Sequence, residues 1–181
     1  MNKIELSKFI SLILRHKPDI VGICLDEHGW ASVNALISGI NRTGKYIDIK
    51  LLEDIVDTDD KNRYSFNDDK TKIRANQGHS VCVNVELREC VPPDTLYHGT
   101  AIRFVNNIMS EGIKPMSRLY VHLSADIDTA ISVGKRHGEH TVLTIDTKRM
   151  VSDGIKFYLS QNGVWLTKFV DWKYITSLSL G

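Results

Sequence analysis

The stretch Arg74-Ala-Asn-Gln-Gly-His-Ser80 separates two parts of the sequence whose patterns differ. It combines a cation, two amides, a glycine, a histidine and a hydroxyl, which no hydrophobic core requires. Because ligands often bind where two lobes of a protein meet, this composition favours a polar binding site. A polar linker made flexible by its glycine explains the same seven residues equally well. The remainder of the chain has to decide between these interpretations.

The residues before this stretch predict three helices and a hairpin. Apolar residues recur at helical spacing in three segments, and Ser32 and Asp48 are the expected N-caps of the second and third. Three helices followed by a hairpin is the element order of a winged helix. The expected elements are a helix at 4–14, helices carrying apolar residues 33–40 and 51–56, and strands at 63–66 and 72–75.

The charge pattern argues against simple DNA readout by this lobe. The third predicted helix carries acids at Asp48, Glu53, Asp54 and Asp57. Their negative charges would be repelled by the DNA phosphates if this helix entered the major groove. The formal net charge is only +1, and acids and bases are balanced in both parts of the chain. Binding of nucleic acid would therefore depend on a few individual arginines and not on a broad basic face.

The residues after Ser80 read as short strands with helical segments between them. The strands are expected at 81–87, 96–98, 120–123, 141–145 and 163–166, with helices over 102–109 and 125–134. The predicted fold class is therefore α+β. The predicted domains are a winged-helix lobe over residues 1–80 and a β-rich lobe over residues 81–181.

Histidines or amides stand beside glycine or a hydroxyl at four strand ends of the second part. Each such segment alone is more often structural, but four of them indicate a binding site. An imidazole beside an unobstructed backbone N–H suits a ribose hydroxyl or an amide-bearing ring. The segments are Tyr97-His-Gly-Thr100, Tyr120-Val-His-Leu-Ser124, Val133-Gly-Lys-Arg-His-Gly138 and Ser160-Gln-Asn-Gly-Val-Trp165.

Several other classes of protein are disfavoured by missing motifs. The sequence contains no P-loop, no Gly-x-Gly-x-x-Gly and no Gly-x-Ser-x-Gly nucleophile elbow. Its seven histidines include no His-x-x-x-His pair, and we expect no metal. Three cysteines without Cys-x-x-Cys spacing predict reduced, mostly buried thiols. Neither a signal peptide nor an apolar run of roughly 18 residues is present, which predicts a cytoplasmic protein without a membrane span.

Taken together, the motifs resemble a known family, the NAD-dependent RNA (tRNA) 2′-phosphotransferases of the KptA type. The likeness covers nearly the whole chain, and several motifs in the same order are far more specific than one. It rests on residues 14–18 (Leu-Arg-His-Lys-Pro), 26–30 (Asp-Glu-His-Gly-Trp), 73–80, 96–100, 121–124, 133–138 and 162–167 (Asn-Gly-Val-Trp-Leu-Thr).

The resemblance implies a winged-helix RNA-binding lobe followed by an NAD-binding lobe of the ADP-ribosyltransferase type, with the phosphate held between them. In the implied reaction an internal RNA 2′-phosphate attacks NAD and expels nicotinamide, so that ADP-ribose is joined to the phosphate. The ribose 2″-hydroxyl then attacks phosphorus. The products are RNA with a free 2′-hydroxyl and ADP-ribose 1″,2″-cyclic phosphate. NAD is thus consumed, the partner is RNA bearing a 2′-phosphate, and a monomer is expected.

The resemblance also implies roles for individual residues. The implied catalytic and phosphate-binding set is Arg15, His16, Arg74 and Arg136, with Arg118 as an extra cation for phosphate binding. His16 would assist the departing RNA 2′-oxygen. The implied NAD-binding residues are His98, Gly99, Thr100, His122, Ser124, Gln161, Asn162 and Val164.

One departure from the ADP-ribosyltransferase pattern bears on the acceptor. Many of these enzymes carry a glutamate at the position of Val164, and no glutamate stands between Asp153 and Gly181. An acceptor that is already a phosphate anion needs no such base. Two alternatives stay open: a transferase that stops after the first step, and a non-catalytic winged-helix module that senses NAD.

Overall fold

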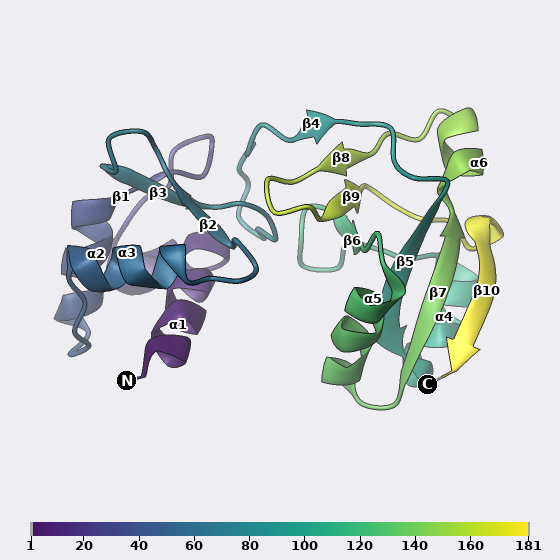
Figure 1. The fold of residues 1–181 in the computed structure, drawn as a ribbon, viewed down its shortest axis with the longest axis horizontal. Helices are drawn as coiled ribbons and strands as arrows, with labels where there is room; N and C mark the ends of the chain where they lie inside the picture. The colour runs from purple at the N-terminus through teal and green to yellow at the C-terminus, as the bar shows by residue number, and fades with distance from the viewer. Residues whose placement is uncertain (1, 181) are drawn as a thin grey trace. The chain divides into compact units, whose positions relative to one another are not determined.

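The computed structural model describes residues 2–180 and divides the chain into two compact units, Met1–Glu86 and Leu87–Gly181 (Figure 1). Each unit encloses a hydrophobic core of its own. Helices and antiparallel sheets occur in both, which confirms the α+β class.

Unit 1 has the three helices and the hairpin that the sequence predicts. Ser32 and Asp48 cap α2 and α3, because their side chains accept hydrogen bonds from the N–H groups of Ala35 and Leu51. The strands form an antiparallel sheet in the order β1-β3-β2. The elements are α1 (Lys3–Arg15), η1 (Pro18–Val21), β1 (Ala31–Ser32), α2 (Val33–Arg42), α3 (Ile49–Asp57), β2 (Tyr64–Phe66) and β3 (Lys72–Ala75).

The core of unit 1 is built from the apolar faces of its three helices and the inner face of its sheet. Ile10 and Ile13 of α1 and Ile73 of β3 are completely buried there. Helix α1 begins with a capping box between Asn2 and Glu5 and ends at Arg15. The same core thus holds both α1, which ends at Arg15, and β3, which leads into residues 76–80.

The segment 81–87 is not a strand, so that prediction was wrong. Its side chains do alternate in exposure, with Val81, Val83 and Val85 half-buried. The valines pack near the turn at Gly29, where Val85 and Val83 lie closest, and the backbone pairs with no neighbouring strand within residues 2–180. The period-2 pattern thus comes from packing of an extended segment, here called the strap (residues 81–86), and not from a sheet.

Unit 2 contains two antiparallel sheets, ordered β10-β7-β5 and β4-β8-β9-β6. The sequence predicted neither the long strand β10 nor the helix α6. The elements are β4 (Arg88–Glu89), β5 (Thr95–Ala101), η2 (Ile102–Phe104), α4 (Val105–Glu111), β6 (Val121–Leu123), α5 (Ile127–Gly134), η3 (Lys135–His137), β7 (His140–Asp146), α6 (Thr147–Ser152), β8 (Tyr158–Leu159), β9 (Trp165–Thr167), η4 (Trp172–Tyr174) and β10 (Ile175–Leu180).

The two sheets of unit 2 are tied together at one point. The backbones of Tyr97 in β5 and Ser124 after β6 exchange two hydrogen bonds, of 2.9 and 2.8 Å. The end of β6 is thereby held beside the middle of β5. Side chains from both sheets can consequently face one ligand.

Cysteine placement differs from the prediction, since Cys24 and Cys82 are exposed and Cys90 is only half-buried. All three thiols are free. No helix between residues 2 and 180 has both the length and the apolar character needed to cross a membrane.

Gly99 allows helix α5 to lie directly against strand β5, and Figure 1 shows the two side by side. A Cβ atom at Gly99 would lie 1.7 Å from the carbonyl oxygen of Ala130 and 2.9 Å from the backbone nitrogen of Gly134. Both atoms belong to the helix backbone, so no side-chain rotation could make room. The absence of a side chain at position 99 is thus required by packing.

Gly99→Ala is expected to destabilise the protein by about 2–4 kcal/mol, because α5 must move away from β5. Gly134→Ala is the matched control, since a Cβ there would come no closer than 3.0 Å to a neighbour and its backbone is helical. Thermal unfolding of both variants checks this. Equal melting temperatures for Gly99→Ala and the wild type would contradict the packing described here.

Candidate functional site

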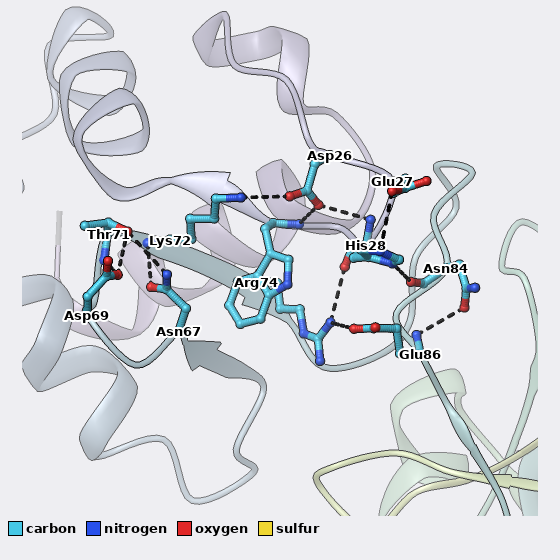
Figure 2. Close-up of polar contacts among 11 residues, drawn as sticks. Asp26, Glu27, His28, Asn67, Asp69, Thr71, Lys72, Arg74, Asn84 and Glu86 are labelled. Atoms are coloured by element: carbon cyan, nitrogen blue, oxygen red, sulfur yellow. Dashed lines mark hydrogen bonds and ion pairs between the residues drawn. The ribbon is translucent and has the colours of Figure 1, made fainter.

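Arg74 in β3 is a buried arginine held in a fixed orientation (Figure 2). Its guanidinium carbon lies 4.4 Å from the centre of the Trp30 ring, which is a cation–π contact. Nη1 donates to the backbone oxygen of His28 at 3.5 Å and to Glu86 at 3.3 Å. By contrast, Nε of Arg74 is buried and has no hydrogen-bond partner among residues 2–180.

The turn from Asp26 to Trp30 positions these partners of Arg74. Asp26 accepts hydrogen bonds from the N–H groups of His28 and Trp30, at 3.0 and 2.9 Å, and from Lys72 at 3.2 Å. Partial burial opposes ionisation of Asp26, but these hydrogen bonds outweigh it and lower the pKa of the carboxyl group. A charged Asp26 therefore shapes the turn, and the turn places the indole beneath the arginine.

The end of α1 contacts the other end of the stretch 74–80. Ser80 donates its backbone N–H to the oxygen of Arg15 at 2.9 Å, and its hydroxyl lies 2.9 Å from Nδ1 of His16. Gly78 has a φ of +88°, a conformation that favours glycine, and its Cα faces the Arg15 guanidinium. Arg15, His16 and Arg74, which the sequence places far apart, are thus gathered around one short segment of unit 1.

His79 is a buried histidine at the centre of this group. Its side chain is only 3% exposed, and burial together with the charges of Arg15, His16 and Arg74 lowers its pKa to about 4. It is therefore neutral at physiological pH. Its Nε2 atom is buried and has no hydrogen-bond partner in the part of the chain that the structure describes. The group is a concentration of positive charge, in which Glu86 is the one acid of residues 2–180 that pairs with Arg74.

In unit 2, two histidines predicted to bind NAD are fixed by backbone carbonyls. Nδ1 of His98 lies 3.1 Å from the oxygen of His122, and Nδ1 of His122 lies 3.0 Å from the oxygen of Tyr120. Since a carbonyl only accepts, each Nδ1 carries the proton. Burial lowers the pKa of His98, as do the charges of Arg118 and His137, although its hydrogen bond to His122 acts in the opposite direction. The neutral ring of His98 thus offers Nε2 as an acceptor.

The remaining residues predicted to bind NAD lie on or next to the strands β5, β6, β8 and β9. Thr100 is buried near the end of β5, and Gly99 serves the packing of α5 described above. The Ser160 hydroxyl donates to Asn162, and its oxygen accepts from the backbone N–H of Val164 at 3.0 Å. This turn joins β8 to β9, and β9 pairs with β6. Three segments distant in sequence are brought together here, namely His98–Thr100, His122–Ser124 and Gln161–Val164.

Arg118 and Arg136 are neighbours in unit 2. Arg118 follows α4 in a loop, and Arg136 lies in η3 after α5. Partial burial and the positive charge of Arg136 lower the pKa of Arg118. The two positive charges repel each other, so an anion bound beside them would be stabilised.

Some residues of the site were missed by sequence reasoning. Trp30 and His79 lie inside quoted motifs, but no pattern showed that they would contact or surround the arginines. Glu86 lies in the segment expected to be a strand, so its contact with Arg74 had no sequence signal. Metal chemistry has no geometric support here, since no three His, Cys, Asp or Glu residues between 2 and 180 are grouped as a metal site.

Comparison with known proteins agrees with the motifs. Residues 1–169 match a family model described as RNA 2′-phosphotransferase, Tpt1 / KptA family. A protein of Fusobacterium nucleatum subsp. nucleatum, named probable RNA 2′-phosphotransferase, is 56% identical over 175 residues, which cover 96% of this chain and 98% of its own.

Two further relatives carry the same name. That of Flavobacterium johnsoniae is 51% identical over 171 residues, covering 94% of each chain, and that of Hahella chejuensis is 46% identical over 172 residues, covering 95% of this chain and 92% of its own. These matches extend through both units. The resemblance drawn from the sequence motifs is thus confirmed, and the chain belongs to the RNA 2′-phosphotransferase (Tpt1 / KptA) family.

Proposed function

We propose that this protein removes an internal 2′-phosphate from RNA by transferring it to NAD. The observation that carries the proposal is the cationic group in unit 1, where Arg15, His16 and Arg74 surround the neutral His79. Nε of Arg74 is a buried donor without a hydrogen-bond partner among residues 2–180, and such a donor is costly unless a ligand satisfies it. A phosphate dianion supplies an acceptor oxygen for this donor and negative charge for the surrounding cations.

Arg74 is suited to hold that phosphate without preventing it from reacting. The stacking on Trp30 fixes the plane of the guanidinium, so little side-chain entropy is lost when an anion binds. Two planar N–H groups contact two phosphate oxygens and leave a third oxygen to act as nucleophile. Arg15 and, from unit 2, Arg136 are proposed to complete the phosphate-binding set, with Arg118 as its candidate extra member.

The proposed reaction has two steps. In the first, a phosphate oxygen forms a bond to the anomeric carbon of the nicotinamide riboside while the bond to nicotinamide breaks. In the second, the ribose 2″-hydroxyl bonds to phosphorus and the RNA 2′-oxygen leaves with a proton. The products are RNA with a 2′-hydroxyl and ADP-ribose 1″,2″-cyclic phosphate. The arginines stabilise the negative charge that develops on the phosphoryl oxygens.

His16 is proposed to supply the proton to the departing 2′-oxygen. Its Nδ1 lies against the Ser80 hydroxyl, which fixes the ring and directs Nε2 away from that hydroxyl. His79 is proposed to take no part as an acid, because a pKa of about 4 leaves its ring neutral at physiological pH.

Unit 2 is proposed to bind NAD. Imidazoles whose orientations are fixed by carbonyls suit ribose hydroxyls or an amide, and His98 and His122 are both fixed in this way. Val164 stands where an activating glutamate would serve a protein acceptor, which agrees with a phosphate acceptor. On this proposal unit 1 is a winged-helix lobe that binds RNA, unit 2 is an ADP-ribosyltransferase lobe, and the enzyme acts as a monomer.

Incubation with a short RNA carrying one internal 2′-phosphate, with and without NAD, tests the proposal. Chromatography of RNA and nucleotides should reveal NAD-dependent loss of the phosphate together with ADP-ribose cyclic phosphate. Stable ADP-ribosylated RNA would instead identify a transferase that stops after the first step. Binding of NAD without any change in the RNA would identify a sensor.

Arg74→Ala should reduce turnover by about 100-fold or more, since it removes a charged donor from the phosphoryl group. Arg74→Lys should also be strongly impaired, because lysine keeps the charge but lacks the planar fork. Arg63→Ala is the matched control from the same hairpin, where Arg63 pairs with Asp59. Near wild-type turnover in folded Arg74→Ala would remove Arg74 from the mechanism, and melting temperatures establish that the variants are folded.

His16→Ala should slow the second step more than the first, so the ADP-ribosylated RNA intermediate should accumulate in a single-turnover time course. Ser80→Ala should give a smaller accumulation in the same direction, because it removes the partner that orients the ring. A His16→Ala time course in which substrate decays slowly and no intermediate forms would contradict the proton-donor role.

A further inference from the structure

Glu86 contacts the arginine that the proposed function assigns to the phosphate. Its Oε2 lies 3.3 Å from Nη1 of Arg74, and no other acid within residues 2–180 is paired with that arginine (Figure 2). The two partners differ in exposure: the side chain of Arg74 is 8% exposed and that of Glu86 is 59% exposed. The cation is fixed, whereas the carboxylate reaches it from the solvent side.

The contact has the features of a replaceable anion. It is long and uses one guanidinium nitrogen, whereas an arginine and a well-placed oxyanion form two parallel hydrogen bonds. Glu86 also adopts a φ of +56°, which an L-amino acid with a long side chain rarely adopts. The strap therefore accepts an unfavourable backbone conformation at the residue whose carboxylate meets Arg74.

The rest of the strap holds Glu86 at this position. Asn84 donates its N–H to the oxygen of Glu27 at 2.8 Å, and its own oxygen lies 3.0 Å from Nδ1 of His28. Its side-chain oxygen accepts from the N–H of Glu86 at 3.1 Å. Hence the carboxylate is delivered to Arg74 by a defined turn and is not an accidental surface contact.

We infer that Glu86 is an internal anion that occupies the phosphate-binding side chain of Arg74 in the RNA-free protein and is displaced when the RNA 2′-phosphate binds. The inference rests on the proposed function, since it takes Arg74 as a phosphate ligand. Glu86 is thereby a specificity determinant: an RNA without the 2′-phosphate has no dianion to compete with the carboxylate. The displaced Glu86 returns to solvent, which its exposure already allows.

Binding measurements without NAD test this with two short RNAs that differ only in one internal 2′-phosphate. Glu86→Gln should increase affinity for the phosphorylated RNA about fivefold more than affinity for the plain RNA, because the competing charge is gone. Glu27→Gln is the matched control: Glu27 is on the same network and 86% exposed, but it has no contact with Arg74. It should change both affinities equally.

The outcomes are distinguishable. An unchanged or reduced preference in Glu86→Gln would overturn the inference and leave Glu86 as a support for Arg74 or a bystander. Glu86→Asn repeats the test with an uncharged residue that tolerates a positive φ, so a folding defect in one variant does not decide the result. Failure of the wild type to prefer the phosphorylated RNA would instead refute phosphate recognition by the proposed function itself.

Discussion

The stacking of Arg74 on Trp30 is the interaction on which the candidate site depends. A buried guanidinium is costly unless its charge and its N–H groups are satisfied. The indole ring of Trp30 faces the guanidinium, and the His28 carbonyl and Glu86 accept from Nη1, while Nε has no partner within the described chain. The protein thus tolerates the unfavourable desolvation of the Arg74 guanidinium, whose remaining N–H donor suits an anion. Asp26 fixes the turn that makes this possible.

Local rules predicted the local structure of unit 1 well. Ser32 and Asp48 are caps as expected, and the helical spacing and the hairpin residues match the observed elements. The strap was misassigned because alternating valines satisfy the same period whether they pack in a sheet or on a turn. In unit 2, β10 was missed since Ile175–Leu180 is defined by its long-range pairing with β7 and not by any local signal.

The candidate site was predictable in its residue types and only partly in its geometry. The motifs named Arg15, His16, Arg74 and Arg136 as one set, and the structure brings the first three of them together in unit 1. The low pKa of His79 depends on burial and on three cations that come from different elements, so no local pattern contains it. Glu86 and Arg74 are paired across twelve positions only because the strap folds back. Such contacts belong to tertiary structure.

The contact between Gly99 and α5 holds together the strand that carries His98 and the helix that precedes Arg136. His98 precedes Gly99 on β5, and Arg136 follows α5 after only one intervening residue. With backbone against backbone, the strand and the helix cannot shift independently, so the separation between the main-chain positions of His98 and Arg136 is set by direct contact of main-chain atoms. A substitution that pushed α5 away from β5 would therefore move the backbone that carries Arg136 relative to the backbone that carries His98.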